Sequence, residues 1–185
     1  LRRELYRHIN TLSHAEIDRI DRELRGKLSN LVLVGMPGSG KSSLLKLLLG
    51  EPIQHTGAIS LASGLIFSYV SQDTSHLRGS LSAYAQENQI DESLFKALLR
   101  KLDFERVQFE KDISEFSGGQ KKKVLIARSL CERAHVYVWD EPLNFIDIYS
   151  RRQIEALIAA YAPTMLFVEH DAAFCSAIAT KSIQL

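Results

Sequence analysis

Cysteine is scarce in this sequence: only Cys131 and Cys175 occur among 185 residues, and each stands alone in an apolar segment. Neither belongs to a CxxC pair or to a histidine-rich spacing, so the cysteines give no indication of a metal site. This usage is typical of a reducing compartment, and we expect a cytoplasmic protein.

An excess of charge and long apolar runs are also lacking. Lysine and arginine total 23 against 22 aspartates and glutamates, which leaves a formal net charge of +1 and no overall field to attract a polyanion. No apolar run approaches the ~20 residues that span a bilayer, and the N-terminal "LRRELYRHIN" has no apolar signal-peptide core. We therefore expect no direct membrane insertion. The 45% hydrophobic content is sufficient for the buried core of one domain.

The first thirty residues have a helical pattern. Ser13 and Glu16 form a capping box in front of apolar residues that recur every three or four positions, which predicts a helix over about residues 14–25. We therefore divide the chain into a helical N-terminal segment, 1–30, and one domain, 31–185.

From residue 31 onward, predicted strands and helices alternate. The apolar runs "NLVLVG", "HVYVWD" and "TMLFV" are typical of buried parallel strands, and "TGAISLASGLIFSYV" is also rich in β-forming residues. Helical patterns occupy 42–50, 80–102, 119–132, 150–161 and 171–179, and a short "SIQL" ends the chain. The alternation predicts an α/β fold with a mainly parallel sheet flanked by helices and a small helical insertion.

Two details of these helices are specific enough to test. In the insertion, Leu94, Leu98 and Leu102 recur every four residues, which predicts that they lie on one face of a helix. Further along, Ser150 and Gln153 form a second capping box, which predicts that a helix begins at Ser150.

The first motif with chemical content is "GMPGSGKSS", which matches the phosphate-loop pattern G-x-x-x-x-G-K-[ST] between a predicted strand and a predicted helix. The glycines let the backbone curl around a phosphate, Lys41 reaches the β- and γ-oxygens, and the Ser42 hydroxyl can ligate Mg²⁺. We therefore expect ATP and Mg²⁺ as cofactors. The predicted nucleotide-binding residues are Gly35, Pro37, Gly38, Ser39, Gly40, Lys41, Ser42 and Ser43.

A second motif, "HVYVWDEP", is an apolar strand that ends in two carboxylates. Asp140 is suited to hold the magnesium ion, and Glu141 to polarise an attacking water as a general base. Adjacent strand residues point to opposite faces, so the two can serve one site only if the chain turns there. Pro142 favours such a turn.

Two further polar residues follow apolar runs, Gln72 in "YVSQD" and His170 in "FVEHD". Both are expected at strand ends on the edge of the sheet where open α/β proteins bind ligands. There Gln72 can orient water and Mg²⁺, and His170 can contact the γ-phosphate.

The stretch "EFSGGQ" predicts a second anion-binding turn, Ser117–Gln120, at the start of a helix. One bound triphosphate is already held by the glycine-rich loop, so this turn is idle unless it serves another nucleotide. We infer from the sequence that it contacts the nucleotide of a second subunit, in a head-to-tail pair that buries two ATP molecules.

The ordered set of motifs resembles an ATP-binding cassette (ABC) domain. From about residue 31 to 185, the Walker A, Q-loop, signature, Walker B, D-loop and switch-histidine motifs of that family are similar to "GMPGSGKS", "SQD", "FSGGQ", "VYVWDEP", "IDIYS" and "VEHD". The resemblance implies a P-loop ATPase with a helical signature subdomain at 80–116. It also implies that Ser117, Gly118 and Gly119 contact the partner's ATP, that Glu141 is the catalytic base and that Asp147 lies at the dimer contact.

Within that family, "DEPLNFID" resembles the DEPxNxxD form of the ABC-F group, whose soluble twin-cassette members act on ribosomes. "GQKKKVLIARSL" and "LLRKLDF" look most like the second cassette of antibiotic-resistance proteins in that group. The resemblance therefore implies a second cassette and the ribosome as partners. Leu143, Phe145 and Ile146 depart from the commoner Thr, His and Leu of the group.

The N-terminal part departs further from the family pattern. A cassette begins with an antiparallel β-subdomain that carries an aromatic residue for adenine, whereas 1–30 are helical in pattern and Tyr6 is their only aromatic residue. We therefore expect this subdomain to be reduced or missing, and Tyr6 is a candidate platform for the base.

Three other functions are open at this point. The chain can be the ATPase subunit of a membrane ABC transporter, which shares the chemistry but not the partner. It can be a metabolite kinase, because "LVLVGMPGSGKSS" is similar to kinases such as shikimate kinase. It can also be a cassette that is silent without its twin.

Overall fold

The computed structural model describes residues 30–56, 59 and 61–185. The predicted helix at 14–25 and the candidate base platform Tyr6 lie outside these residues.

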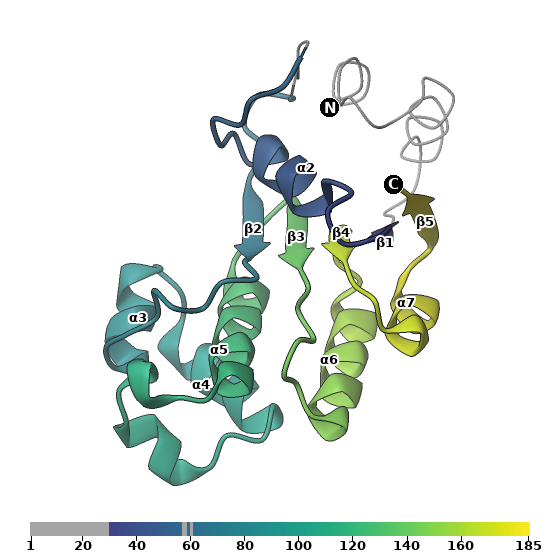
Figure 1. Ribbon diagram of the computed structural model, residues 1–185. Coiled ribbons are helices and arrows are strands. Elements are labelled where there is room, and N and C mark those ends of the chain that lie inside the picture. The colour runs from purple at the N-terminus through teal and green to yellow at the C-terminus, as the bar shows by residue number, and fades with distance from the viewer. Residues whose placement is uncertain (1–29, 57–58, 60) are drawn as a thin grey trace.

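The described part of the chain is built around a five-stranded sheet in the order β2-β3-β4-β1-β5 (Figure 1). Every pairing among these strands is parallel, which confirms the predicted fold class. The strands are β1 (Asn30–Val34), β2 (Phe67–Val70), β3 (Val136–Asp140), β4 (Met165–Val168) and β5 (Lys181–Gln184).

Helices connect the strands as the alternating pattern predicts. They are α2 (Lys41–Leu48), α3 (Leu81–Glu87), α4 (Glu92–Lys101), α5 (Gly118–Cys131), α6 (Ile148–Tyr161) and α7 (Ala172–Ile178), with short 3-10 turns η1 (Arg106–Glu110) and η2 (Ile113–Glu115). None of the helices in the described ranges is long and apolar enough to cross a bilayer.

The sheet separates two hydrophobic cores, because successive strand residues point to opposite faces. In β1, Leu31 and Leu33 pack with α2, whereas Val32 between them belongs to the larger core that α3 to α7 form with the other face. Neighbouring residues of β3 divide in the same way, with Val138 on the α2 side and Trp139 on the other. Both faces of the central strands are therefore buried, which explains why their sequences are apolar without alternation.

The helical insertion contains two helices rather than one. In α4 the buried positions are Phe95, Leu98 and Leu99, followed by Leu102 just beyond the helix. Leu94 is 41% exposed, so it lies at the margin of the buried face of this helix. Phe95 fills the core position because a helical face takes residues three and four apart, and Phe95 is three residues before Leu98.

Two other predicted boundaries also need correction. In the β-rich stretch 56–70, only Phe67–Val70 forms a described strand, where it pairs with β3. Helix α6 begins at Ile148, because the Asp147 side chain caps it by accepting a hydrogen bond of 2.8 Å from the Ser150 backbone N–H. The predicted capping box at Ser150 was therefore wrong, since the carboxylate upstream satisfies the first turn.

The parallel order brings the carboxyl ends of the strands to one edge of the sheet. Residues that follow β1, β2, β3 and β4 begin at Gly35, Ser71, Glu141 and Glu169. Each of the loop, glutamine, carboxylate and histidine motifs therefore starts at this edge, although they come from distant parts of the chain.

Candidate functional site

The segment Gly35–Ser43, called the glycine loop below, connects β1 to α2. Gly38 and Gly40 have φ of 83° and 90°, a left-handed conformation that side chains with a Cβ adopt at a cost. A Cβ on Gly35 would lie 2.7 Å from the carbonyl oxygen of Leu185 and 2.7 Å from Ser39 Oγ. The glycines are therefore required by the local backbone.

The Lys41 side chain returns over the glycine loop. Its Nζ donates hydrogen bonds to the carbonyl oxygens of Gly35 (2.8 Å) and Met36 (2.9 Å), and the residue is only 6% exposed. Pro37 is exposed on the loop, and Ser43 is exposed on the first turn of α2. The loop thus has an exposed backbone tip around a central ammonium group, which fits a phosphate chain.

Ser42 and Asp140 meet across the edge of the sheet. Ser42 Oγ donates to Asp140 Oδ1 at 3.2 Å, and Asp140 is 1% exposed. Burial raises the pKa of Asp140, and the nearby Glu141 adds to this, although the Ser42 hydrogen bond opposes it. A hydroxyl oxygen and a buried carboxylate form a donor set that suits Mg²⁺.

Glu141 lies where the chain turns sharply after β3. Its φ is 47°, so the strand ends at Asp140 and the two carboxylates are not held on opposite faces. Glu141 Oε2 accepts hydrogen bonds from Gln72 Nε2 at 2.8 Å and from Asn144 Nδ2 at 2.6 Å. His170 Nε2 lies 3.8 Å from Oε1. The structure thus brings Gln72, Asn144 and His170 together around the Glu141 carboxylate.

Two residues of this region were missed by the sequence reasoning. Asn144 holds Glu141, as described above. Glu169 is 5% exposed, and its carboxylate accepts hydrogen bonds from the backbone N–H of Leu143 at 3.1 Å and of His170 at 2.7 Å. Glu169 therefore ties the loop after β3 to the loop after β4. The acidic residue next to His170 in "FVEHD" was the available signal.

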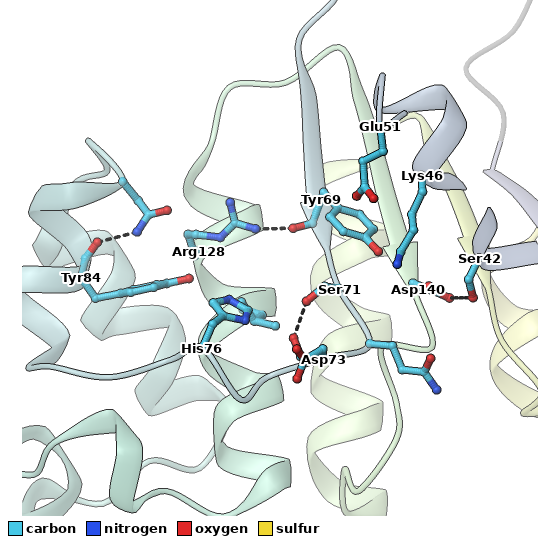
Figure 2. A pocket seen from close by; sticks show the side chains of 13 residues that line it. Ser42, Lys46, Glu51, Tyr69, Ser71, Asp73, His76, Tyr84, Arg128 and Asp140 are labelled. Atoms are coloured by element: carbon cyan, nitrogen blue, oxygen red, sulfur yellow. Dashed lines mark hydrogen bonds between the residues drawn. The ribbon is translucent and has the colours of Figure 1, made fainter. Parts of the chain in front are cut away.

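The residues of the glycine loop with Gln72, Asp140, Glu141 and His170 are called the loop half-site. A hollow of about 630 Å³ adjoins it (Figure 2), bordered by Ser42, Gln72 and Asp140. Figure 2 shows Lys46, Glu51 and Tyr69 on the same side of this hollow as Asp140. Burial raises the pKa of Tyr69 to about 12, so its hydroxyl remains protonated.

Ser117–Gln120, called the signature turn, begins α5. Ser117 Oγ accepts from the Gln120 backbone N–H at 3.2 Å, and the Gln120 side chain accepts from the Ser117 N–H at 3.0 Å, which completes a capping box. A Cβ on Gly119 would lie 2.4 Å from the Phe145 carbonyl oxygen, whereas one on Gly118 would be 3.5 Å or more from the Phe145 ring. Gly119 is therefore the residue that lets the signature turn pack closely against the loop after β3.

Asp147 lies beside this turn, and together they are called the turn half-site. Asp147 Oδ2 lies 3.0 Å from Lys123 Nζ, and its carboxylate also accepts from the Ser150 hydroxyl at 2.8 Å. Burial alone would raise the pKa of Asp147, but the hydrogen bonds from Ser150 and Lys123 lower it far below its usual range. A hollow of about 270 Å³ is bordered by Ser117, Gly119 and Asp147.

The two half-sites face different hollows that share no bordering residue. The predicted site residues therefore fall into two groups. The structure brings the glycine loop, Gln72, Asp140, Glu141 and His170 to one sheet edge, and it places Ser117, Gly118, Gly119, Gln120 and Asp147 apart from them at the start of α5 and α6.

The sequence matches a protein-family model described as "ABC transporter" over residues 25–144. It is 31% identical over 159 residues to the ATP-binding protein Uup of Buchnera aphidicola subsp. Acyrthosiphon pisum, covering 82% of this chain and 27% of that protein. It is 28% identical over 179 residues to the ribosome protection protein VmlR of Bacillus subtilis, covering 93% of this chain and 30% of that protein. The chain thus spans less than a third of these relatives' length.

A similar fold occurs in the crystal structure of the complex of the archaeal ribosomal stalk protein aP1 and the archaeal ribosome recycling factor aABCE1. The TM-score is 0.69 at 25% sequence identity, and the match covers 85% of this chain and 32% of that one.

Proposed function

This chain belongs to the ABC transporter family of ATPases, and we propose that it works as one cassette of a head-to-tail pair that encloses two ATP molecules. The observation that carries this proposal is the separation of the loop half-site from the turn half-site. Each has features of a phosphate-binding device, and the two border different hollows that have no residue in common. A second cassette, arranged head to tail, lets each turn half-site complete the loop half-site of its partner.

In the proposed mechanism, the glycine loop and Lys41 hold the triphosphate. Ser42 and Asp140 would hold Mg²⁺, with Gln72 at the margin of that site, and the ion supplies charge neutralisation of the phosphate oxygens. The Glu141 carboxylate accepts a proton from the attacking water. Its orientation is kept by the amides of Gln72 and Asn144, which donate to one oxygen and leave Oε1 facing His170.

On the partner side, the free backbone N–H groups at the start of α5 would contact the γ-phosphate of the other cassette's ATP. Ser117 and Gln120 hold that turn in shape through their capping box, and the Asp147–Lys123 ion pair fixes the loop before α6 against α5. His170 would sense the γ-phosphate from the opposite side.

We further propose that the pair acts on ribosomes, as an ABC-F-type factor of translation or antibiotic resistance in the cytoplasm. The similarity to a ribosome protection protein and to a ribosome recycling factor supports this, as does the "DEPLNFID" sequence. The alternative is the ATPase subunit of a membrane transporter. Co-sedimentation with purified ribosomes, compared with co-sedimentation with membranes, separates the two; retention on membranes alone would contradict the ribosomal role.

The cassette mechanism is tested by Glu141→Gln. Loss of the base should lower kcat by about 100-fold or more, because general-base catalysis contributes about 10²–10⁴. With Mg-ATP the variant should accumulate as a dimer on a sizing column, because the closed pair no longer turns over. Glu110→Gln, an exposed residue of η1, is the matched control and should behave as wild type.

The concentration dependence gives an independent check. If two chains are needed for one active site, wild-type turnover per chain rises with protein concentration until the pair is saturated. A turnover per chain that stays constant from nanomolar to high micromolar concentration, together with Glu141→Gln that binds ATP but elutes as a monomer, would contradict the pairing.

A further inference from the structure

Lys122 is the most deeply buried lysine of the described residues, at 1% exposure. It lies in the second turn of α5, two residues after the signature turn, and it follows Lys121 in a run of three lysines that gives no hint of its burial. Neither the nucleotide-binding nor the catalytic role described above uses it. A buried ammonium group is costly unless its protons are hydrogen-bonded, so its partners explain its position.

Two carbonyl oxygens accept hydrogen bonds from Lys122 Nζ. One is Ser71 O, at 2.7 Å, and the other is Asp140 O, at 3.3 Å. Ser71 and Asp140 come from different strands, and each lies immediately before a residue of the loop half-site. Ser71 precedes Gln72, and Asp140 precedes Glu141.

The side chains of these next residues are themselves joined, because Gln72 Nε2 donates to Glu141 Oε2 at 2.8 Å. The contacts therefore form a closed ring. It runs from Lys122 through Ser71 to Gln72, across to Glu141, and back through Asp140 to Lys122. The Lys122 ammonium group thus holds the backbone immediately before Gln72 and immediately before Glu141, the two residues whose side chains are hydrogen-bonded to each other.

We infer that Lys122 is a positioning residue for ATP hydrolysis, which ties the Gln72–Glu141 pair to the helix that begins at the signature turn. The inference rests on the proposed function, since it assigns Lys122 to the same reaction. It adds a physical link between the two half-sites of one chain. A displacement of α5 by nucleotide bound at its N-terminus would move both carbonyls that flank the catalytic pair.

The surroundings account for a lysine at this position. Burial lowers the pKa of Lys122 to about 8, while the charges of Asp140, Glu141, Glu169 and Asp73 oppose that shift. The group therefore remains protonated at neutral pH, with three donors for two carbonyls and the nearby carboxylates. A neutral apolar side chain of similar length would fill the space but leave both carbonyl oxygens without this donor.

The experiment compares Lys122→Met with Lys101→Met, which removes an exposed lysine of α4, in the full chain. We expect Lys122→Met to lower kcat about tenfold with the KM for ATP within about twofold of wild type, because binding residues are untouched. Lys122→Gln, which can donate to one carbonyl, should give an intermediate kcat and serves if the Met variant folds poorly. Lys101→Met should match wild type.

A double-mutant cycle with Gln72→Ala separates positioning from a general loss of structure. If Lys122 acts through the Gln72–Glu141 pair, the double variant should have a kcat within about twofold of the kcat of Gln72→Ala alone. Losses that multiply independently, an unchanged kcat in both Lys122 variants, or an effect on KM alone would each overturn the inference. Absence of turnover by wild type under conditions that saturate pairing would instead overturn the proposed function.

Discussion

The loop half-site and the turn half-site treat their carboxylates in opposite ways. Asp140 in the loop half-site is almost fully buried with one hydroxyl donor and a second carboxylate beside it, and its pKa is raised. Asp147 in the turn half-site is half exposed, caps a helix and pairs with Lys123, and its pKa is lowered.

The difference shows what each half-site contributes. In the turn half-site, the Asp147 carboxylate is paired within one chain by Lys123 and Ser150. The loop half-site concentrates negative charge where burial penalises it, and such a site gains most from binding a cation. The Asp147 carboxylate therefore stabilises local structure, whereas the Asp140 carboxylate is destabilised by its surroundings in the absence of a cation.

The largest expected effect tests the loop half-site. Lys41→Met removes the ammonium group at the centre of the glycine loop, and with it the proposed charge-assisted hydrogen bonds to phosphate oxygens, of about 1.5 kcal/mol each. We expect the affinity for ATP to fall about 100-fold, measured by isothermal titration calorimetry. Lys101→Met is the control, and ATP binding by Lys41→Met within threefold of wild type would contradict the role of the loop.

A smaller effect tests the rigidity of the turn half-site. In Gly119→Ala the added Cβ would lie 2.4 Å from the Phe145 carbonyl oxygen, a backbone atom that cannot rotate away. We expect the free energy of unfolding to fall by about 2–3 kcal/mol, as in other overpacked sites. Gly118→Ala is the matched control, because its Cβ has ordinary contact with the Phe145 ring. Urea unfolding that gives equal values for the two variants would show that the close packing is not rigid.

The smallest effect compares the two aspartates directly through pH. The raised pKa of Asp140 means that the folded protein binds its proton more tightly than the unfolded chain, so its contribution to stability falls as the pH rises above about 4. The lowered pKa of Asp147 gives stabilisation that is present above about pH 4 and is lost on acidification.

The corresponding measurement is urea unfolding of Asp140→Asn and Asp147→Asn between pH 3 and 7, without nucleotide or Mg²⁺. Asp147→Asn should lose up to about 1 kcal/mol at pH 7 and less at pH 3, a modest value because the ion pair is half exposed. Asp140→Asn should gain stability relative to wild type as the pH rises. The same sign of pH dependence in both variants would remove the contrast between the half-sites.

The sequence predicted the order of strands and helices along the chain. It also predicted that the motifs meet at one edge of the sheet. Apolar runs of the central strands and the glycine, glutamine and histidine motifs are local patterns, and each one predicts where a strand ends. The turn at Glu141 was likewise indicated by Pro142. The prediction of Ser150 as a cap was wrong because two capping residues compete there, and the surrounding structure selects Asp147.

The sequence by itself determined that this chain is an α/β ATPase cassette with a glycine-rich loop and a Ser-Gly-Gly turn, because these signals depend on residues close together along the chain. Only the tertiary structure decided that Lys122 is buried, that it joins the carbonyls of Ser71 and Asp140, and that Glu169 connects the loops after β3 and β4. The physical reason is that burial and hydrogen-bond partners depend on which distant segments pack together. A run of three lysines is the same sequence whether its middle member faces water or two backbone carbonyl oxygens.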